Sequence, residues 1–406
     1  MRILWFSVTP SLFNPKSNSV NGGGWVASLE QIVRGIPDVD LGVAFYFPDT
    51  QFRYDRDGVA YYPIAPRRPG IVDRLRGRRP DYTDHYLRII RDFKPDLIQL
   101  FGSESDYGKI CRLTDIPVVI HMQGSIPPYH NALFPQAMNT ADFYLRRGLS
   151  LRQRIFGIRA DSAFRRTAAM ETETLKSCRH FMGRTDWDRN IVALHNPAAR
   201  YYHCEEALRD SFIASAKRWQ PADDGKVRII SVISTPWYKG LDVILKTARL
   251  LKDNTGLDFE WRVYGIRDAR FFEKKYGIRA DDVNVRIMGT ASKDELVEAL
   301  TSSSVYVHTS YIDNSPNSLC EAQYLGVPVL ATFVGGIPSM VADGEDGILY
   351  PANDPYTLAG LIKRLAGDRE LCERLSAAAT GRARRRHDPA AIAARLHTIY
   401  SSILSE

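Results

Sequence analysis

The sequence lacks several features that would assign it to other classes of protein. It has only five cysteines, an odd number without a CxxC pair, which argues against a disulfide framework and a structural zinc site. These are Cys111, Cys178, Cys204, Cys320 and Cys372. Without an apolar run of about 18 residues, no membrane-spanning helix is predicted, and the start MRILWFSVTP indicates a buried strand, not a signal peptide. No GxGxxG follows a strand and no HxxH or HExxH occurs, so neither a dinucleotide dehydrogenase nor a metal site is predicted.

Positive charge is concentrated in two stretches of the chain, whose net charge is +7. Residues 67–79 hold six arginines and one acid, and residues 143–166 hold seven arginines and one acid among interleaved aromatic and aliphatic residues. Two interpretations remain open, solvated basic faces or a surface that lies against anionic lipid. The second makes an anionic membrane surface a partner. Nucleic acid is not expected as a partner, because no recognition motif accompanies the charge.

Short β-branched or aromatic runs alternate with amphipathic stretches in two series, which favours parallel sheets with helical crossovers. Helices are expected over 240–254 and 292–303. Strands are expected over 2–8, 41–47, 96–101, 117–122, 227–233, 259–265, 284–289, 304–309 and 327–332. A polar zone at 196–226 separates the series. We therefore expect domains at 1–205 and 206–387, with a last helix (388–406) that packs back on the first.

The stretch YIDNSPNSLCEAQYLG (311–326) has the features of a helix N-terminus that follows a buried strand. Ser315 is a suitable N-cap and Pro316 a suitable first helical residue. Such a terminus lies at the edge of a parallel sheet where open α/β folds bind ligands. Its unpaired backbone amides predict an anion site formed by Asn317, Ser318 and Leu319.

Two carboxylates and a glycine pair surround this predicted anion site. Glu321 shares a helix face with Asn317 and Ser318, and would accept hydrogen bonds from ligand hydroxyls instead of binding phosphate. Gly335 and Gly336 follow the next strand and bring backbone amides to the same place. The arrangement suits a nucleoside diphosphate. The alternative is that Asp313 and Glu321 are ordinary surface and capping acids.

At this point the chain resembles a known family. An acid, seven residues and then Glu-Ala, followed by LGVPVLAT and GGIP, is similar to the retaining glycosyltransferases of the GT-B fold, family 4. TPWYKGLDVIL resembles the family's basic segment, which implies that Lys239, followed by Gly240, binds the donor diphosphate. NGGGWVASLE resembles the glycine-rich loop of the cleft, which implies a ligand-approaching backbone at Gly22, Gly23 and Gly24. The implied fold is α/β: two Rossmann-like doubly wound domains that face each other across a cleft.

The chain departs from the family pattern at two positions. Asp313 stands where a glutamate is usual, and Ser234 stands where an arginine is usual. The resemblance therefore implies help from another arginine, for which Arg184 is the candidate. A lone histidine after a strand is more often structural, but the family implies that His121 contacts the donor sugar. The implied catalytic set is Asp313, Glu321, Lys239 and His121.

The resemblance implies retaining transfer of a sugar from a nucleotide-diphosphate donor to a hydroxyl of a glycan acceptor. The preferred acceptor is polyprenyl-diphosphate-linked, and no cofactor or metal is expected. The expected location is cytoplasmic, peripheral on the inner face of the plasma membrane. Alternatives are a nucleotide-sugar epimerase, which would convert the donor without an acceptor, and a non-catalytic nucleotide-sugar-binding subunit. Alanine at Glu321 or Lys239 is expected nearly to abolish transfer and to leave the fold intact.

Overall fold

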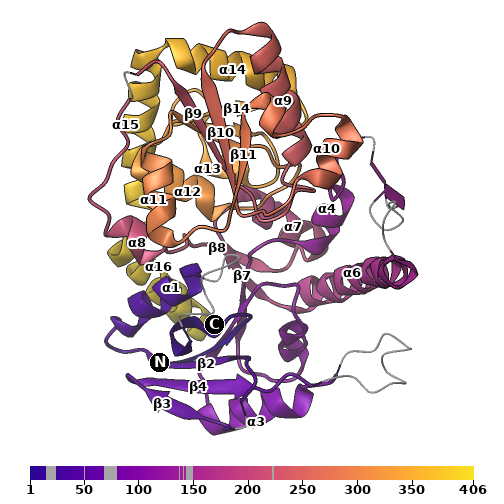
Figure 1. Cartoon of the computed structure of the whole chain (residues 1–406). Helices are drawn as coiled ribbons and strands as arrows, with labels where there is room; N and C mark the ends of the chain where they lie inside the picture. Colours follow the sequence, from indigo (N-terminus) through magenta and orange to yellow (C-terminus); the bar gives the residue numbers. More distant parts are fainter. Residues whose placement is uncertain are drawn as a thin grey trace. The chain divides into compact units, whose positions relative to one another are not determined.

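The computed structural model describes residues 1–14, 24–49, 51–67, 80–136, 138–139, 141–142, 150–221 and 224–406, without the side chains of 151–160. The chain forms two compact units (Figure 1). The first comprises Met1–Pro127, Gly148–Ala207 and His387–Glu406, and the second comprises Pro128–Arg147 and Leu208–Arg386. The second unit thus takes residues 128–147 from within the range 1–205 that the sequence assigned to the first domain.

The first unit contains an eight-stranded sheet in the order β3-β4-β2-β1-β5-β6-β7-β8. All neighbours pair in parallel except β3 and β4. The strands are β1 Arg2–Ser7, β2 Asp40–Tyr46, β3 Tyr54–Arg56, β4 Val59–Ile64, β5 Leu97–Phe101, β6 Val118–His121, β7 His180–Gly183 and β8 Arg200–His203. Central strands such as β1 and β5 are apolar and almost fully buried, as expected for a parallel sheet covered on both faces.

Helices cover this sheet and include the C-terminal helix of the chain. They are η1 Ser11–Phe13, α1 Gly24–Arg34, α3 Thr83–Phe93, η3 Asp106–Arg112, α6 Leu151–Ser177, α7 Asp186–His195 and α16 Pro389–Leu404; α4 Ile126–Asn131 carries the chain into the second unit. On α16, Leu396 and Tyr400 are buried in the first unit's core, and the Tyr400 hydroxyl donates to Gln99 Oε1 at 2.5 Å. These contacts fix α16 to the first unit.

The second unit is built on six parallel strands in the order β11-β10-β9-β12-β13-β14. The strands are β9 Val227–Val232, β10 Phe259–Tyr264, β11 Val285–Gly289, β12 Val305–His308, β13 Val329–Thr332 and β14 Ile348–Tyr350. The strand that comes first in sequence therefore lies in the middle of the sheet, beside the fourth. This is the strand order of a doubly wound Rossmann-like domain.

The helices of this unit lie on both sides of its sheet, with α9 and α10 on one side and α11 and α12 on the other (Figure 1). They are α8 Asp210–Ile213, α9 Leu241–Asn254, α10 Arg270–Tyr276, η4 Asp281–Val283, α11 Lys293–Thr301, α12 Asn317–Leu325, α13 Ile337–Met340, α14 Pro355–Gly367 and α15 Arg369–Arg386. Their ends follow local rules. Ser292 and Glu295 form a capping box on α11, and Gly326 ends α12 in a left-handed conformation.

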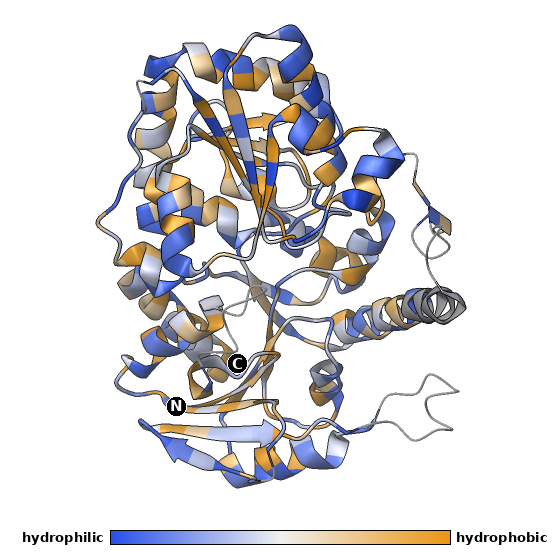
Figure 2. Cartoon of the chain, viewed as in Figure 1, coloured by the Kyte–Doolittle hydropathy of each residue, from blue (hydrophilic) through white to orange (hydrophobic). Residues whose placement is uncertain are grey.

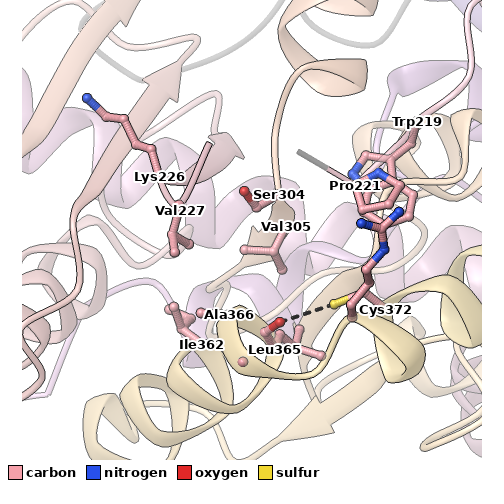
Figure 3. Close-up of a pocket in the computed structure, with 13 residues that line it drawn as sticks. Trp219, Pro221, Lys226, Val227, Ser304, Val305, Ile362, Leu365, Ala366 and Cys372 are labelled. Atoms are coloured by element: carbon pink, nitrogen blue, oxygen red, sulfur yellow. Dashed lines mark hydrogen bonds between the residues drawn. The ribbon is translucent and has the colours of Figure 1, made fainter. Parts of the chain in front are cut away.

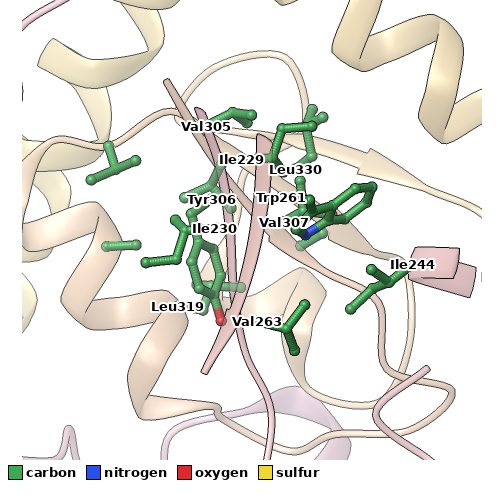
Figure 4. Close-up of a cluster of buried hydrophobic side chains, with 14 of the residues drawn as sticks. Ile229, Ile230, Ile244, Trp261, Val263, Val305, Tyr306, Val307, Leu319 and Leu330 are labelled. Atoms are coloured by element: carbon green, nitrogen blue, oxygen red, sulfur yellow. The ribbon is translucent and has the colours of Figure 1, made fainter. Parts of the chain in front are cut away.

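The core of the second unit forms where the sheet meets these helices (Figure 4). Ile229, Ile230, Tyr306, Val307 and Leu330 project from β9, β12 and β13 and are fully buried. The same strands are predominantly hydrophobic in Figure 2, whereas the surrounding helices alternate between hydrophobic and hydrophilic residues. The apolar faces of the helices therefore cover both faces of the sheet. The loops at the ends of its strands are the positions left for a ligand site.

The nine strands expected from the sequence are confirmed to within two residues at each end. The five that the sequence did not predict are β3, β4, β7, β8 and β14. Four of these contain only three or four residues. Segments of that length carry too little alternation to indicate a strand.

Candidate functional site

Two loops of the second unit diverge at the carboxyl ends of the neighbouring strands β9 and β12. The loop after β9 leads to α9 and contains Lys239, whereas the loop after β12 leads to α12 and contains Asp313. Because α9 and α12 lie on different sides of the sheet, this is the point where the winding direction changes. Open α/β sheets bind ligands at such a switch point. The strand order therefore places Lys239 and Asp313 at the switch point, where folds of this architecture bind ligands.

Lys239 and Asp313 form a buried ion pair. The Lys239 ammonium donates to Asp313 Oδ2, and the two side chains are 12% and 7% exposed. Burial alone would raise the pKa of the Asp313 carboxyl. The charge of Lys239 and a hydrogen bond from His308 outweigh burial and hold this pKa well below its usual range. Asp313 is therefore a permanent anion at neutral pH, and Lys239 is its counter-ion.

A chain of hydrogen bonds connects Asp313 to the first turn of α12. His308 Nε2 lies 2.9 Å from Asp313 Oδ2, His308 Nδ1 lies 3.1 Å from the Tyr306 hydroxyl, and that hydroxyl lies 2.8 Å from Ser318 Oγ. An ionised carboxylate only accepts, so His308 must carry its proton on Nε2. Tyr306 then donates to Nδ1 and accepts from Ser318. Burial lowers the pKa of His308, which agrees with a neutral imidazole.

The glycine pair after β13 packs directly on the Asp313 backbone. Gly336 donates its amide to the Asp313 carbonyl at 2.9 Å, and Gly335 has a φ of +54°. A Cβ added at Gly335 would overlap that carbonyl oxygen. A comparable approach occurs at Gly240, which has a φ of +75° and whose Cβ would overlap the Thr309 carbonyl. Glycine is thus required at both positions for the loops to converge.

Replacing Gly335 with alanine is expected to lower the free energy of unfolding by roughly 2 kcal/mol or more, because it combines a positive φ with a backbone overlap. Gly360→Ala is the matched control. Gly360 lies exposed within α14, its φ is not positive, and a Cβ there would meet nothing within 4 Å. The Gly360→Ala variant should have a free energy of unfolding about 0.5–1 kcal/mol higher than that of the wild type. Urea denaturation of both variants checks the contrast, and equal stabilities would contradict this account of the loop.

Glu321 is bound by an arginine that the sequence did not single out. Arg209 Nε and Nη2 donate to Glu321 Oε1 and Oε2 at 2.6 and 2.7 Å, and the Glu321 side chain is 1% exposed. Burial raises the pKa of this carboxyl, and the adjacent guanidinium opposes the rise. Both carboxylate oxygens therefore already have a strong bidentate partner.

The first turn of α12 differs in detail from the sequence-based prediction. The helix begins at Asn317 with Pro316 as the capping residue, one position later than the predicted Ser315 cap. The Leu319 amide donates to the Pro316 carbonyl at 3.1 Å. The prediction that Leu319 offers an outward amide is therefore wrong. Asn317 and Ser318 remain the candidates at this helix end.

The chain is similar over its whole length to solved structures. Sucrose-phosphate synthase from Thermosynechococcus elongatus matches with a TM-score of 0.72 at 14% identity, covering 100% of this chain and 99% of that one. Anabaena Alr3699/HepE, in complex with UDP and glucose, matches with a TM-score of 0.65 at 14% identity, covering 99% and 100%. The two Rossmann-like units account for this likeness. The fold is GT-B.

Sequence similarity reaches a smaller part of the GT-B chain. Residues 214–382 match the family described as Glycosyl transferases group 1. The amylovoran biosynthesis glycosyltransferase AmsK of Erwinia amylovora is 28% identical over 188 residues, which are 44% of this chain and 45% of that protein. The chain therefore spans less than half the length of this curated relative. The family match includes Lys239, Asp313 and Glu321.

Two predicted site residues belong to the first unit of the GT-B fold. His121 ends β6, but its imidazole is 0% exposed and packs against the rings of Trp25 and Phe101, with centroids 5.1 and 5.8 Å away. Burial, together with the charge of Arg184, lowers the pKa of His121 to about 3. The implied contact of His121 with the donor sugar stays a prediction. Arg184 is also buried and pairs with Glu206 at 3.0 Å.

The other predicted positions have simpler outcomes. Ser234 is exposed, two residues beyond the end of β9. Gly22 and Gly23 lie outside the described residues, and Gly24 is the first residue of α1. The role of Arg184 at the diphosphate stays a prediction. The arginine that contacts a predicted site residue in the second unit is Arg209, through Glu321. No motif in the sequence marked Arg209, because it lies in the irregular zone at 196–226. The folded chain brings it to Glu321.

A cavity of about 330 Å³ lies at the opposite edge of the second unit's sheet (Figure 3). Val227 and Val305, the first residues of β9 and β12, line it. Cys372 also lines it and donates its thiol to the Leu365 carbonyl at 3.3 Å. Because Lys239 and Asp313 follow the carboxyl ends of the same strands, this cavity is separate from the candidate site.

Two searches of the described residues complete the description. None of the helices there combines the length and apolar character needed to span a lipid bilayer. In the same part of the chain, His, Cys, Asp and Glu side chains form no group of three or more that is arranged to hold a metal ion.

Proposed function

We propose that the protein is a retaining glycosyltransferase that moves a hexose from a nucleoside-diphosphate donor to a hydroxyl of a glycan acceptor. The observation that carries the proposal is the buried Lys239–Asp313 pair at the switch point, next to the N-terminus of α12. This places a cation, a carboxylate and helix-end amides around one position. A diphosphate joined to a sugar has the complementary charges and hydroxyls.

Lys239 has the donors needed to hold the diphosphate during departure. An ammonium offers three N–H groups, so Lys239 can keep its bond to Asp313 and still reach a phosphate oxygen. Negative charge grows on the leaving diphosphate as the bond to the sugar breaks, and a fixed cation with helix-end amides stabilises that charge. The carboxylate of Asp313 stabilises the positive character that develops on the sugar. The leaving phosphate oxygen takes the proton of the acceptor hydroxyl, as the family resemblance implies.

The relatives supply the first substrates to test. Alr3699/HepE was crystallised with UDP and glucose, and AmsK is named for amylovoran biosynthesis. We therefore take UDP-glucose as the first donor and a polyprenyl-diphosphate-linked glycan of a bacterial surface polysaccharide as the first acceptor. A thermal-shift screen of UDP, GDP, ADP and dTDP with their glucose conjugates identifies the base, since stabilisation grows with ligand affinity.

Incubation with the donor alone and with donor plus acceptor tests the reaction class. We expect a glycosylated product only when both are present, with the anomeric configuration of the donor retained. Conversion of the donor to an epimer without acceptor would support the epimerase alternative. Binding without either reaction would support a non-catalytic subunit.

Turnover is expected to persist in EDTA. Lys239 and the N-terminal turn of α12 provide positive potential for the diphosphate from the protein itself. The measurement is the initial rate of transfer after exhaustive chelation, compared with the rate after magnesium or manganese is restored. Full loss of turnover with recovery on metal addition would contradict metal-independent transfer.

The protein is proposed to act at the cytoplasmic membrane surface through its two arginine-rich segments. Residues 68–79 and 143–149 and the side chains of 151–160 lie outside the described residues, so this proposal rests on the sequence. We expect co-sedimentation with phosphatidylglycerol vesicles at low salt and release at high salt, because screening acts within about 8 Å at physiological ionic strength. Replacing Arg146, Arg147, Arg152 and Arg154 with serine should reduce binding. Equal partitioning into neutral and anionic vesicles would contradict it.

A further inference from the structure

A segment from the middle of the first unit's sequence packs on the second unit's ligand-binding loops. We call residues 128–142 the strap; within it, 137 and 140 lie outside the described residues. The strap follows β6 in the chain, yet the Met138 side chain is buried in the second unit's core. Its further contacts are Phe134 with Trp237 (ring centroids 6.4 Å apart), Gln136 with Asn353, and Asp142 with Lys275 (2.7 Å).

Tyr129, near the start of the strap, meets the proposed donor site directly. Its hydroxyl donates to Asp313 Oδ1 at 3.3 Å and accepts the backbone amide of Asn314 at 3.1 Å. Its ring packs edge-to-face on Tyr238, the neighbour of Lys239, with centroids 5.2 Å apart. A hydroxyl that donates to a carboxylate and accepts from an amide makes the two bonds by which a protein binds a sugar hydroxyl.

The two oxygens of the Asp313 carboxylate have different surroundings. Oδ2 accepts hydrogen bonds from Lys239, His308 and Ser310, which belong to the candidate site itself. Among the hydrogen bonds of the described residues, Oδ1 receives that of Tyr129 alone. Oδ1 is thus the oxygen that a ligand hydroxyl would approach. A hydroxyl that also accepted the Asn314 amide would displace the Tyr129 hydroxyl, because a backbone amide has a single hydrogen to donate.

We propose that the Tyr129 hydroxyl occupies the binding position of a donor-sugar hydroxyl, so that the strap competes with the sugar for Asp313 Oδ1 and the Asn314 amide. This inference rests on the proposed function. Tyr129 then determines affinity and selectivity for the sugar part of the donor. The nucleoside diphosphate is held by Lys239 and α12 and does not meet this competition. A protein whose binding-competent state is only partly populated shows a correspondingly weaker apparent affinity.

Titration calorimetry on Tyr129→Phe tests the proposal, with the nucleoside diphosphate found in the screen and its glucose conjugate as ligands. Phenylalanine keeps the ring on Tyr238 and removes only the competing hydroxyl. We expect the Kd of the sugar conjugate to fall roughly three- to tenfold, the value of one hydrogen bond, with the Kd of the diphosphate unchanged. The matched control is Tyr356→Phe, which removes the hydroxyl of a 75% exposed tyrosine on α14. It should change neither the Kd of the diphosphate nor that of the sugar conjugate.

Each other outcome decides the question as well. An unchanged or higher Kd for the sugar conjugate in Tyr129→Phe would overturn the proposal, since Tyr129 would then be neutral or a contact for the sugar. Equal tightening of diphosphate and conjugate would also overturn it, because the competition would not be with the sugar. Failure of the wild-type protein to bind any of the four diphosphates or conjugates would instead refute the proposed function.

Discussion

Replacing Lys239 with alanine is expected to lower kcat/KM for transfer by about 100- to 1,000-fold, the usual loss when one preorganised electrostatic group at a leaving group is removed. The substitution removes the cation from the switch point and leaves the buried Asp313 carboxylate without its counter-ion. Initial rates with an identified donor and acceptor measure the effect. Because the unpaired Asp313 carboxylate is also expected to lower stability, circular dichroism and urea-induced unfolding establish that the variant is folded under the assay conditions.

Lys252→Ala is the matched control for this loss. Lys252 lies near the carboxyl end of α9, is exposed, and donates to the Asp282 carbonyl at 2.6 Å. Lys252→Ala changes the net charge of the protein as Lys239→Ala does. Lys252, however, lies near the far end of α9, the helix that follows the Lys239 loop. Its rate should equal that of the wild type. A folded Lys239→Ala protein with wild-type turnover would refute the role given to Lys239.

Replacing Glu321 with alanine is expected to destabilise the second unit by about 3–5 kcal/mol as well as to reduce transfer. The reason is the bidentate bond from Arg209: without Glu321, a partly buried guanidinium loses its partner. The sequence alone led to the expectation that this substitution would leave the fold intact. The Arg209 contact leads us to expect a loss of stability instead. The measurement is urea-induced unfolding of the variant compared with the wild type.

A double-mutant cycle measures the interaction energy between Arg209 and Glu321 separately from their contacts with other residues. Arg209→Ala leaves a 1% exposed carboxylate unpaired, so it should also be destabilising, whereas Arg209→Ala with Glu321→Ala removes both charges. The double variant should be more stable than the sum of the two single effects predicts. Additive effects would show that the two side chains do not stabilise one another.

The sequence predicted the parts of the site that follow from strand order. Lys239, Asp313 and the glycine pair each follow a strongly apolar strand, and parallel strands bring their following loops to the same edge of a sheet. The convergence of the Asp313 carbonyl and the Gly336 amide follows from that order. Local pattern was therefore sufficient to indicate Asp313 and the glycine pair, whereas Lys239 was implied by the family resemblance.

Other contacts depend on tertiary packing that a local pattern does not contain. Arg209 lies in the irregular sequence zone 196–226 and belongs to the second unit. Tyr129 of the strap lies 184 positions from Asp313 along the chain. The sequence analysis did not single out His308, which ends the buried strand β12. Its bonds to Asp313 and Tyr306 depend on how the next loop folds back. The contacts of Arg209, Tyr129 and His308 can therefore be identified only from the folded structure.

A crystal structure of the protein with its nucleoside diphosphate tests the central claim most directly. The distance to measure is the one between the Lys239 ammonium nitrogen and the nearest β-phosphate oxygen. The account predicts hydrogen-bond contact there, with the phosphate at the first turn of α12 beside Ser318. A diphosphate bound elsewhere, for instance in the cavity lined by Val227, Val305 and Cys372, would contradict it.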